Sequence, residues 1–317
     1  MWTHRTSFAT EHLASYTAVQ LIEPALDRTA LSRPYLNNDD PGKAVGQDAP
    51  RSLSRLLMAS RLRRSIVNRT LSLHYQPQFE LGSGLASGME VLARWFPLVG
   101  EAIEPSVFIP LAEETGQIEA LGNSVIEAAC REAIKCCTAG GTALTLCINV
   151  SPLQLNPQLV SSIRAILQRT GFPASQLELE ITEGVLVRDC LTTKRCLFDL
   201  KNLGLQLAID DFGVGYSNLN YLSKFPIDRL KLDKSLTEYV RSDGKEMAIL
   251  SSIIDLCAVL HIKVIAEGVE SEHQFGALRR VGCDQAQGYL LGRPGPMIQA
   301  QLTMDKRWGE RPLRDLQ

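Results

Sequence analysis

The pattern of apolar and polar positions changes near residue 53. Residues 1–52 show little periodicity, although 13–32 could form a helix and 37–52 are rich in turn-forming and polar residues. From there, residues 53–70 repeat apolar positions at helical spacing and predict an amphipathic helix. We therefore expect residues 1–52 to be an N-terminal extension, partly disordered or helical, whose function the sequence does not indicate.

Eight segments of the remaining chain have the composition and periodicity of β-strands. The first two, 71–79 and 84–96, are joined through a turn that contains glycine, as in a hairpin. Most of the others alternate with predicted helices, which is typical of βαβ units in a mostly parallel sheet. The six later strands are expected at 143–150, 177–181, 205–212, 228–233, 263–269 and 284–292.

This alternation predicts an α/β fold of the TIM type. Eight strands in about 240 residues fit a closed (β/α)8 barrel better than an open doubly wound sheet. We predict the barrel domain over 53–304 and a charged C-terminal tail over 305–317. Helices are expected at 105–116, 122–139, 157–170, 189–203, near 217–224, at 245–260 and at 271–281.

Polar residues recur where the predicted strands end. Chemistry in a barrel of this kind takes place at the carboxyl ends of the strands, so these side chains would converge. Carboxylates gathered there would repel each other, and cations that bind oxygen ligands, such as Mg²⁺ or Mn²⁺, would relieve this repulsion. The set of strand-end residues contains too few His and Cys to favour zinc. The residues are Glu90 with Arg94, Asn149, Glu180 with Glu183, Asp210 with Asp211, Lys231 with Asp233, Glu267 with Glu270, and Gln287.

Adjacent Asp210 and Asp211 would point to opposite faces of a regular strand. The glycine-rich residues that follow them would allow the strand to break, so that both carboxylates face the barrel mouth. One aspartate could then bridge two metal ions, with Lys231 steadying the attacking water or the developing phosphate charge. Turn formation by the aspartates and a surface role for Lys231 remain alternatives from spacing alone.

Composition limits the classes of partner and compartment. The net charge of -2, from 33 basic and 35 acidic residues, argues against a protein that coats DNA or RNA. The 8 cysteines lack CxxC pairs and zinc-ligand spacing, which favours reduced thiols in the core. We find neither a signal-peptide pattern nor a membrane-length apolar run, and therefore expect a soluble, cytoplasmic protein without a membrane partner.

Several short motifs occur in the order of one known family. The chain resembles, over about residues 55–300, the EAL domain family of cyclic di-GMP phosphodiesterases. The name-giving tripeptide is Glu90-Val91-Leu92, with valine in place of alanine, and Asn218 replaces a common serine. The other motifs are YQPQ (75–78), FIPLAEETG (108–116), INVS (148–151), ELEITE (178–183), DDFGVGYSNL (210–219), LKLD (230–233), AEGVE (266–270) and QGYLLGRP (287–294).

The resemblance implies a role for each matching residue. Lys231 would orient the hydrolytic water, Gln287 would lie near that water, and Glu183 would anchor the 210–219 loop. Two ions, Mg²⁺ or Mn²⁺, are implied. The implied catalytic residues are Glu90, Lys231, Glu267 and Gln287. The implied ligands are Glu90, Asn149, Glu180 and Asp210 for the first ion, and Asp210, Asp211 and Glu267 for the second. The implied dinucleotide contacts are Gln76, Leu92, Arg94 and Asp233.

The resemblance also implies an activity and an assembly. The family opens cyclic di-GMP to linear pGpG and forms homodimers near the 210–219 loop. Two alternatives are a receptor that binds cyclic di-GMP without hydrolysis and signals through a protein partner, and a degenerate domain that binds only protein. Such relatives usually lack several metal ligands or the lysine. Every one of those positions keeps the expected residue type here, which favours the enzyme.

Overall fold

The computed structural model describes residues 48–97, 101–140, 144–187, 191–213, 219–241, 244–305 and 308. The chain forms two compact units, one of residues 1–71 with 95–117 and one of residues 72–94 with 118–317. The first predicted helix, 13–32, and part of the 210–219 loop lie outside the described residues. No helix in the described part combines the length and apolar character needed to cross a membrane.

The first unit contains the helices α2 (Asp48–Val67) and α3 (Pro105–Glu114). Trp95 lies between them, because its indole Nε1 donates a hydrogen bond of 2.9 Å to Ser65 Oγ and its ring meets Phe108 edge-on at 6.0 Å. Helix α2 begins five residues before the predicted start at residue 53. The predicted boundary between extension and barrel domain therefore falls inside a helix.

The second unit is a closed barrel of eight strands in chain order, as predicted. Strand β1 pairs antiparallel with both β2 and β8, and all other neighbours pair in parallel. Both the TIM-type fold and its opening hairpin are thus confirmed. The strands are β1 (Ser72–Glu80), β2 (Ala86–Arg94), β3 (Thr145–Asn149), β4 (Leu177–Thr182), β5 (Gln206–Phe212), β6 (Arg229–Leu232), β7 (Lys263–Ala266) and β8 (Gln285–Ala286).

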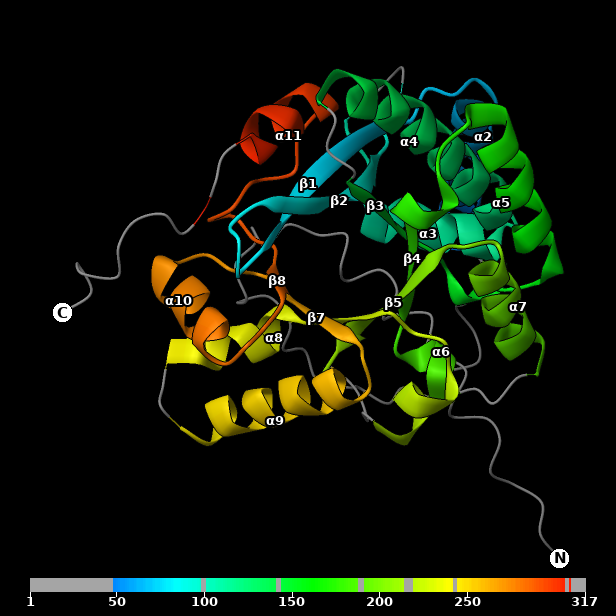
Figure 1. Ribbon diagram of the computed structural model, residues 1–317. Helices are drawn as coiled ribbons and strands as arrows, with labels where there is room; N and C mark the ends of the chain where they lie inside the picture. The colour runs from blue at the N-terminus through cyan, green and yellow to red at the C-terminus, as the bar shows by residue number, and fades with distance from the viewer. Residues whose placement is uncertain are drawn as a thin grey trace, which may run out of the picture. The chain divides into compact units, whose positions relative to one another are not determined.

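Helices surround these strands, as Figure 1 shows for α4, α5, α7, α9 and α10. The α-helices of this unit are α4 (Ile118–Gly140), α5 (Pro157–Thr170), α6 (Gly184–Val187), α7 (Leu191–Asn202), α8 (Lys234–Thr237), α9 (Lys245–Val259), α10 (Glu272–Arg280) and α11 (Met297–Met304). The short 3₁₀ helices are η1 (Pro152–Gln154), η2 (Ala174–Gln176), η3 (Leu219–Lys224) and η4 (Glu238–Arg241).

Local sequence determines where these helices begin and end. In α5, the side chain of Asn156 accepts hydrogen bonds from two backbone N–H groups of the first turn, and Pro157 occupies the first helical position. Gly171 ends the helix in a left-handed conformation that glycine adopts without strain. Between these signals, Leu159, Ile163 and other apolar residues at helical spacing are buried.

Several parts of this unit differ from the prediction. The described part of the helix predicted near 217–224 is the 3₁₀ helix η3, and β7 ends at Ala266 instead of residue 269. The last strand is much shorter than 284–292, because the chain turns at Gly288. A Cβ at Gly288 would lie 2.1 Å from the carbonyl oxygen of Val269, so only glycine allows this close approach. Helix α11, which packs against β1, was not predicted at all.

Candidate active site

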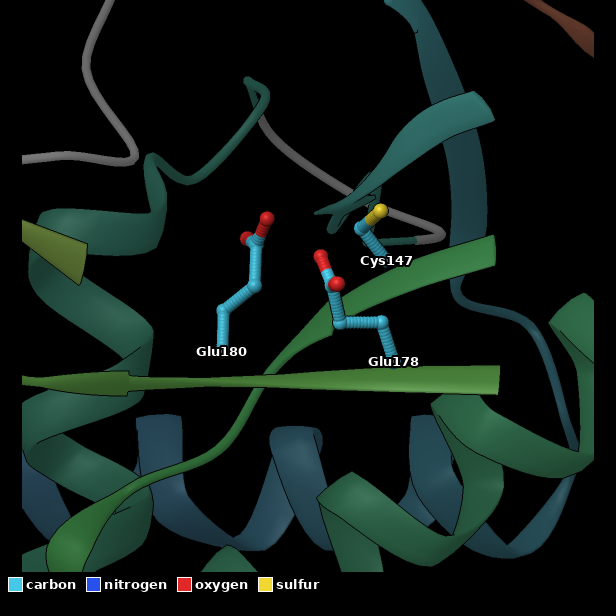
Figure 2. Close-up of side chains that lie close together, drawn as sticks. All are labelled: Cys147, Glu178 and Glu180. Carbon is cyan, nitrogen blue, oxygen red and sulfur yellow. The ribbon is translucent and has the colours of Figure 1, made fainter. Parts of the chain in front are cut away.

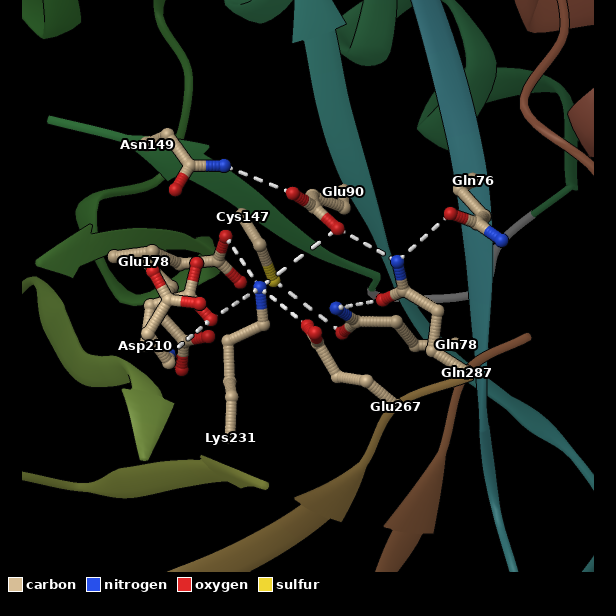
Figure 3. A network of polar contacts seen from close by, with 12 residues as sticks. Gln76, Gln78, Glu90, Cys147, Asn149, Glu178, Asp210, Lys231, Glu267 and Gln287 are labelled. Carbon is tan, nitrogen blue, oxygen red and sulfur yellow. Dashed lines mark hydrogen bonds and ion pairs between the residues drawn. The ribbon is translucent and has the colours of Figure 1, made fainter. Parts of the chain in front are cut away.

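Four of the carboxylates predicted at the strand ends converge on one lysine. Lys231 reaches the centre of the barrel mouth from β6, and its side chain is only 1% exposed (Figure 3). Its Nζ lies 2.9 Å from Glu180 Oε2 and 3.0 Å from Asp210 Oδ1. It lies 2.8 Å from Glu267 Oε1 and 3.7 Å from Glu90 Oε2. Side chains from β2, β4, β5, β6 and the end of β7 therefore meet at one point.

Charge is unbalanced in this cluster. Among the described residues, Lys231 is the only cation within 4 Å of its four carboxylates. Burial raises the pKa of Glu180 well above its usual value, and it raises the pKa of Asp210 as well. Burial, with Asp210 and Glu90 nearby, raises the pKa of Glu267 to about 8. Although burial alone would lower the pKa of Lys231, the carboxylates raise it well above its usual value.

These shifts predict how the stability of the metal-free protein depends on pH. The pKa of Glu267 is raised from 4.5 to about 8, so within that window the folded protein keeps a proton that the unfolded chain releases. The free energy of unfolding in chelator should therefore fall as the pH rises through this window. Urea unfolding at several pH values measures it. A rise in the free energy of unfolding across the same pH window would contradict the raised pKa of Glu267.

Amide side chains hold Glu90 from both sides. Asn149 Nδ2 donates to Glu90 Oε1 at 2.8 Å, and Gln287 Nε2 donates to Glu90 Oε2 at 2.6 Å. Gln287 also donates to Gln76 Oε1 at 3.0 Å, and Gln76 Nε2 donates to the carbonyl oxygen of Gly292 at 3.1 Å. The structure thus brings Asn149 and Gln287 to the cluster of carboxylates, as the sequence predicts, and it places Gln76, predicted only as a dinucleotide contact, beside Gln287.

Asp210 and Asp211 are separated by a break in the strand. The β5–β6 register shifts between Ile209 and Phe212, and Asp211 has a left-handed backbone with φ of 63°. Asp210 is fully buried, whereas Asp211 is partly exposed. The irregularity that the sequence analysis placed in the following glycines therefore lies at Asp211 itself, because a bulge re-aims side chains within the strand.

The other predicted site residues lie in the same unit but outside the lysine cluster. Leu92 and Arg94 share one face of β2 with Glu90, since alternate residues of a strand point the same way. Asp233 caps α8 by accepting a hydrogen bond of 2.8 Å from the N–H of Ser235. Glu183 is 8% exposed and its N–H donates to the carbonyl oxygen of Asp210. Of its predicted loop partner, 210–219, residues 214–218 lie outside the described residues.

A second polar layer, which the sequence analysis missed, lies beneath the mouth. Arg229 Nη1 contacts Glu178 Oε1 at 3.1 Å and Gln78 Oε1 at 3.2 Å, and lies 3.8 Å from Cys147 Sγ. Each of these four residues lies two positions from a mouth residue of its own strand, so strand alternation could have revealed them. Gly88 provides room: a Cβ there would lie 2.7 Å from the Thr145 carbonyl oxygen.

Cys147, Glu178 and Glu180 lie close enough together to hold a metal ion in principle (Figure 2). Their ligand atoms lie within 4.8 Å of one another. However, the guanidinium of Arg229 already contacts the first two, and burial raises the pKa of the Cys147 thiol well above its usual value. A positive neighbour and a protonated thiol both disfavour the binding of a cation. We therefore assign Cys147 and Glu178 to the second polar layer beneath the mouth, called the lower layer below.

The mouth itself suits hard divalent cations. Glu180 Oε1 and Asp210 Oδ2 are buried without a hydrogen-bond partner in the described part of the chain. Buried polar atoms are normally paired, so these two oxygens suggest a missing partner that accepts electron pairs. Carboxylate and amide oxygens together form the donor set that Mg²⁺ and Mn²⁺ prefer. Asn149 turns its nitrogen toward Glu90, which leaves its oxygen for such an ion.

Comparison with known proteins identifies the family. The protein-family model of the EAL domain matches residues 59–294 of the sequence. The chain belongs to the EAL domain family. This EAL domain is 40% identical over 239 residues to the bifunctional diguanylate cyclase/cyclic di-GMP phosphodiesterase MucR of Pseudomonas aeruginosa, covering 75% of this chain and 35% of MucR. It is 38% identical over 248 residues to the cyclic di-GMP phosphodiesterase NbdA of the same organism, covering 78% of this chain and 32% of NbdA.

Solved structures give the same assignment. The EAL domain superposes on the PaMucR phosphodiesterase in complex with c-di-GMP with a TM-score of 0.70 and 39% identity, covering 76% of this chain and 98% of that chain. The EAL enzyme Bd1971, bound to cAMP and cyclic di-GMP, gives 0.72 and 27% identity, covering 80% and 69%. The chain spans roughly a third, 29% to 36%, of the length of the curated relatives it matches.

Proposed function

We propose that this EAL domain hydrolyses cyclic di-GMP to linear pGpG with the help of two divalent cations, Mg²⁺ or Mn²⁺. The main support is the buried cluster of four carboxylates around Lys231, in a chain 40% identical to a relative named as a cyclic di-GMP phosphodiesterase. The activity would lower the concentration of this second messenger in bacterial signalling.

The oxygen ligands divide into two groups that share Asp210. Glu90, Asn149, Glu180 and Asp210 would hold one cation, and Asp210, Asp211 and Glu267 the other. The unpartnered oxygens of Glu180 and Asp210 support the first of these groups. When bound, the cations would lower the pKa of water and offset negative charge on the phosphate.

The residues of the chain would then position the reactants. Lys231 would hold the attacking water through its Nζ, with Glu267, directly after β7, as its neighbour at 2.8 Å. Gln287, which donates to Glu90 at 2.6 Å, would lie beside that water. Gln76, Leu92, Arg94 and Asp233 would contact the dinucleotide. The water would form the new P–O bond as the bond from phosphorus to the 3′ oxygen breaks.

The first experiment tests the activity and its cation dependence together. Purified protein incubated with cyclic di-GMP should yield pGpG in Mg²⁺ or Mn²⁺ and none in excess chelator, as measured by chromatography of the products. Activity that persists in chelator would contradict the two-cation mechanism. Binding of cyclic di-GMP without any product, in both metals, would instead indicate the receptor alternative.

Three expectations from the sequence remain predictions. The homodimer near the 210–219 loop, the cytoplasmic location and the absence of a DNA or RNA partner each need their own measurement. Because the relatives are about three times longer, the activity of the whole protein is part of this proposal.

A further inference from the structure

A chain of three hydrogen bonds connects the lower layer to the candidate metal site. Arg229 Nη1 donates to Gln78 Oε1 at 3.2 Å, and Gln78 Nε2 donates to Gln287 Oε1 at 2.9 Å. Gln287 Nε2 then donates to Glu90 Oε2 at 2.6 Å. All four side chains are buried, and Figure 3 shows the amides of Gln78 and Gln287 side by side below Glu90.

The two ends of this chain determine its direction. A guanidinium only donates hydrogen bonds and an ionised carboxylate only accepts them, whereas a glutamine amide has one donor end and one acceptor end. Arg229 therefore requires the oxygen of Gln78, and Glu90 requires the nitrogen of Gln287. With either amide reversed alone, like groups would face each other at two of the three contacts. Two glutamines in series are thus held in one orientation.

Arg229 is itself held firmly in place. Its Nη1 lies 3.1 Å from Glu178 Oε1, and this side-chain pair is 5% and 0% exposed. The neighbouring carboxylate raises the pKa of Arg229 even though burial opposes that charge, so Arg229 is a permanent donor. The missing side chain at Gly88 leaves space for Gln78, because a Cβ there would lie 3.2 Å from Gln78 Oε1.

We propose that Gln78 and Arg229 are positioning residues, which set the amide orientation of Gln287 and through it the position of Glu90 as a metal ligand. This inference rests on the proposed function, because it assumes that Glu90 binds a cation. A purely structural role would only satisfy buried polar groups. The positioning role goes further, because it makes cation affinity depend on residues that do not touch the cation.

Two substitutions of Gln78 separate these roles. Gln78→Glu still accepts from Arg229 but has no proton for Gln287, whose amide must then turn and present its oxygen to Glu90. Gln78→Met keeps the length of the side chain and removes both hydrogen bonds. Mutation of residues that orient metal ligands commonly costs 10–100-fold in affinity. We therefore expect the dissociation constant for Mn²⁺ to rise about 10–100-fold in both variants, as measured by titration calorimetry.

Matched variants control for folding and packing. Gln285→Met changes another buried amide, on β8 two positions before Gln287, without removing any of these three hydrogen bonds. Its Mn²⁺ affinity should stay at the wild-type value. Arg229→Lys keeps a buried donor-only cation and should retain most of the affinity. In Gln78→Met, saturating Mn²⁺ should restore most of kcat, which a general loss of folded protein would not allow.

The outcomes separate this inference from the proposed function. Wild-type Mn²⁺ affinity in both Gln78 variants, or an equal loss in Gln285→Met, would overturn the positioning role alone. If the Gln78 variants bind Mn²⁺ more weakly than the wild type, as expected, but the wild type releases no pGpG, the result would contradict the proposed hydrolysis and support the positioning role. A wild-type protein that binds no Mn²⁺ would overturn both.

Discussion

Replacement of Lys231 by methionine is expected to lower turnover of cyclic di-GMP by about 10²–10³-fold while Mn²⁺ binding is kept. Lys231 would hold the attacking water, and no other described cation lies within 4 Å of the same four carboxylates. Without it, the buried carboxylates of the metal-free protein lose the cation they share, and removal of one partner of a buried ion pair commonly costs about 3–5 kcal/mol of unfolding free energy. Turnover at saturating Mn²⁺ and urea unfolding in chelator measure the two effects.

Lys234→Met provides the matched control for Lys231. Lys234 pairs with Glu270 at 2.7 Å, but it is 32% exposed, and exposed ion pairs contribute little to stability. This variant should keep both turnover and stability. Loss of bound Mn²⁺ in Lys231→Met would show that the lysine supports metal binding and would contradict the role assigned to it here.

Replacement of Glu180 by glutamine is expected to lower activity without lowering the stability of the metal-free protein. Burial raises the pKa of Glu180 well above its usual value, so an uncharged amide of the same shape suits the metal-free fold. The melting temperature in chelator should therefore stay the same or rise. Turnover should fall by at least about 10²-fold, because a proposed cation ligand is lost. Thermal unfolding in chelator and product chromatography provide the two measurements.

Glu127→Gln is the contrasting variant for Glu180→Gln. Glu127 accepts from Arg131 at 2.7 Å and from Arg169 at 3.0 Å, so its charge is matched by partners. Its amide should lower the melting temperature and leave turnover per folded molecule unchanged. Strong destabilisation of the metal-free protein by Glu180→Gln would show that the Glu180 carboxylate contributes to the fold itself.

The barrel and most of its mouth could be predicted because both follow from short-range rules. Strand alternation locates Glu180 and Lys231 on inward faces, and the barrel rule places the carboxyl ends of the strands together. Strand lengths were less predictable. The end of β8 depends on the close approach of Gly288 to Val269, a contact between segments that no local pattern reveals.

The lower layer was missed and the bulge was misplaced by a few residues, for different reasons. Glu178 and Arg229 lie two positions before Glu180 and Lys231, but their partnership depends on packing across the barrel. The left-handed backbone of Asp211 reflects the shifted pairing of β5 with β6, which is a tertiary effect. Helix α11 was not predicted because it follows the last motif and because no glycine caps its end, unlike the end of α5.

The two-layer interior bears on any attempt to transfer this chemistry to a designed scaffold. Grafting the mouth residues alone would give the right side chains without the support that orients them. The graft would also need the Glu178–Arg229 pair, the amide of Gln78 and, less obviously, an empty position equivalent to Gly88. A host barrel with an alanine at that position would already crowd a backbone carbonyl, so the choice of scaffold would be decided by one absent methyl group.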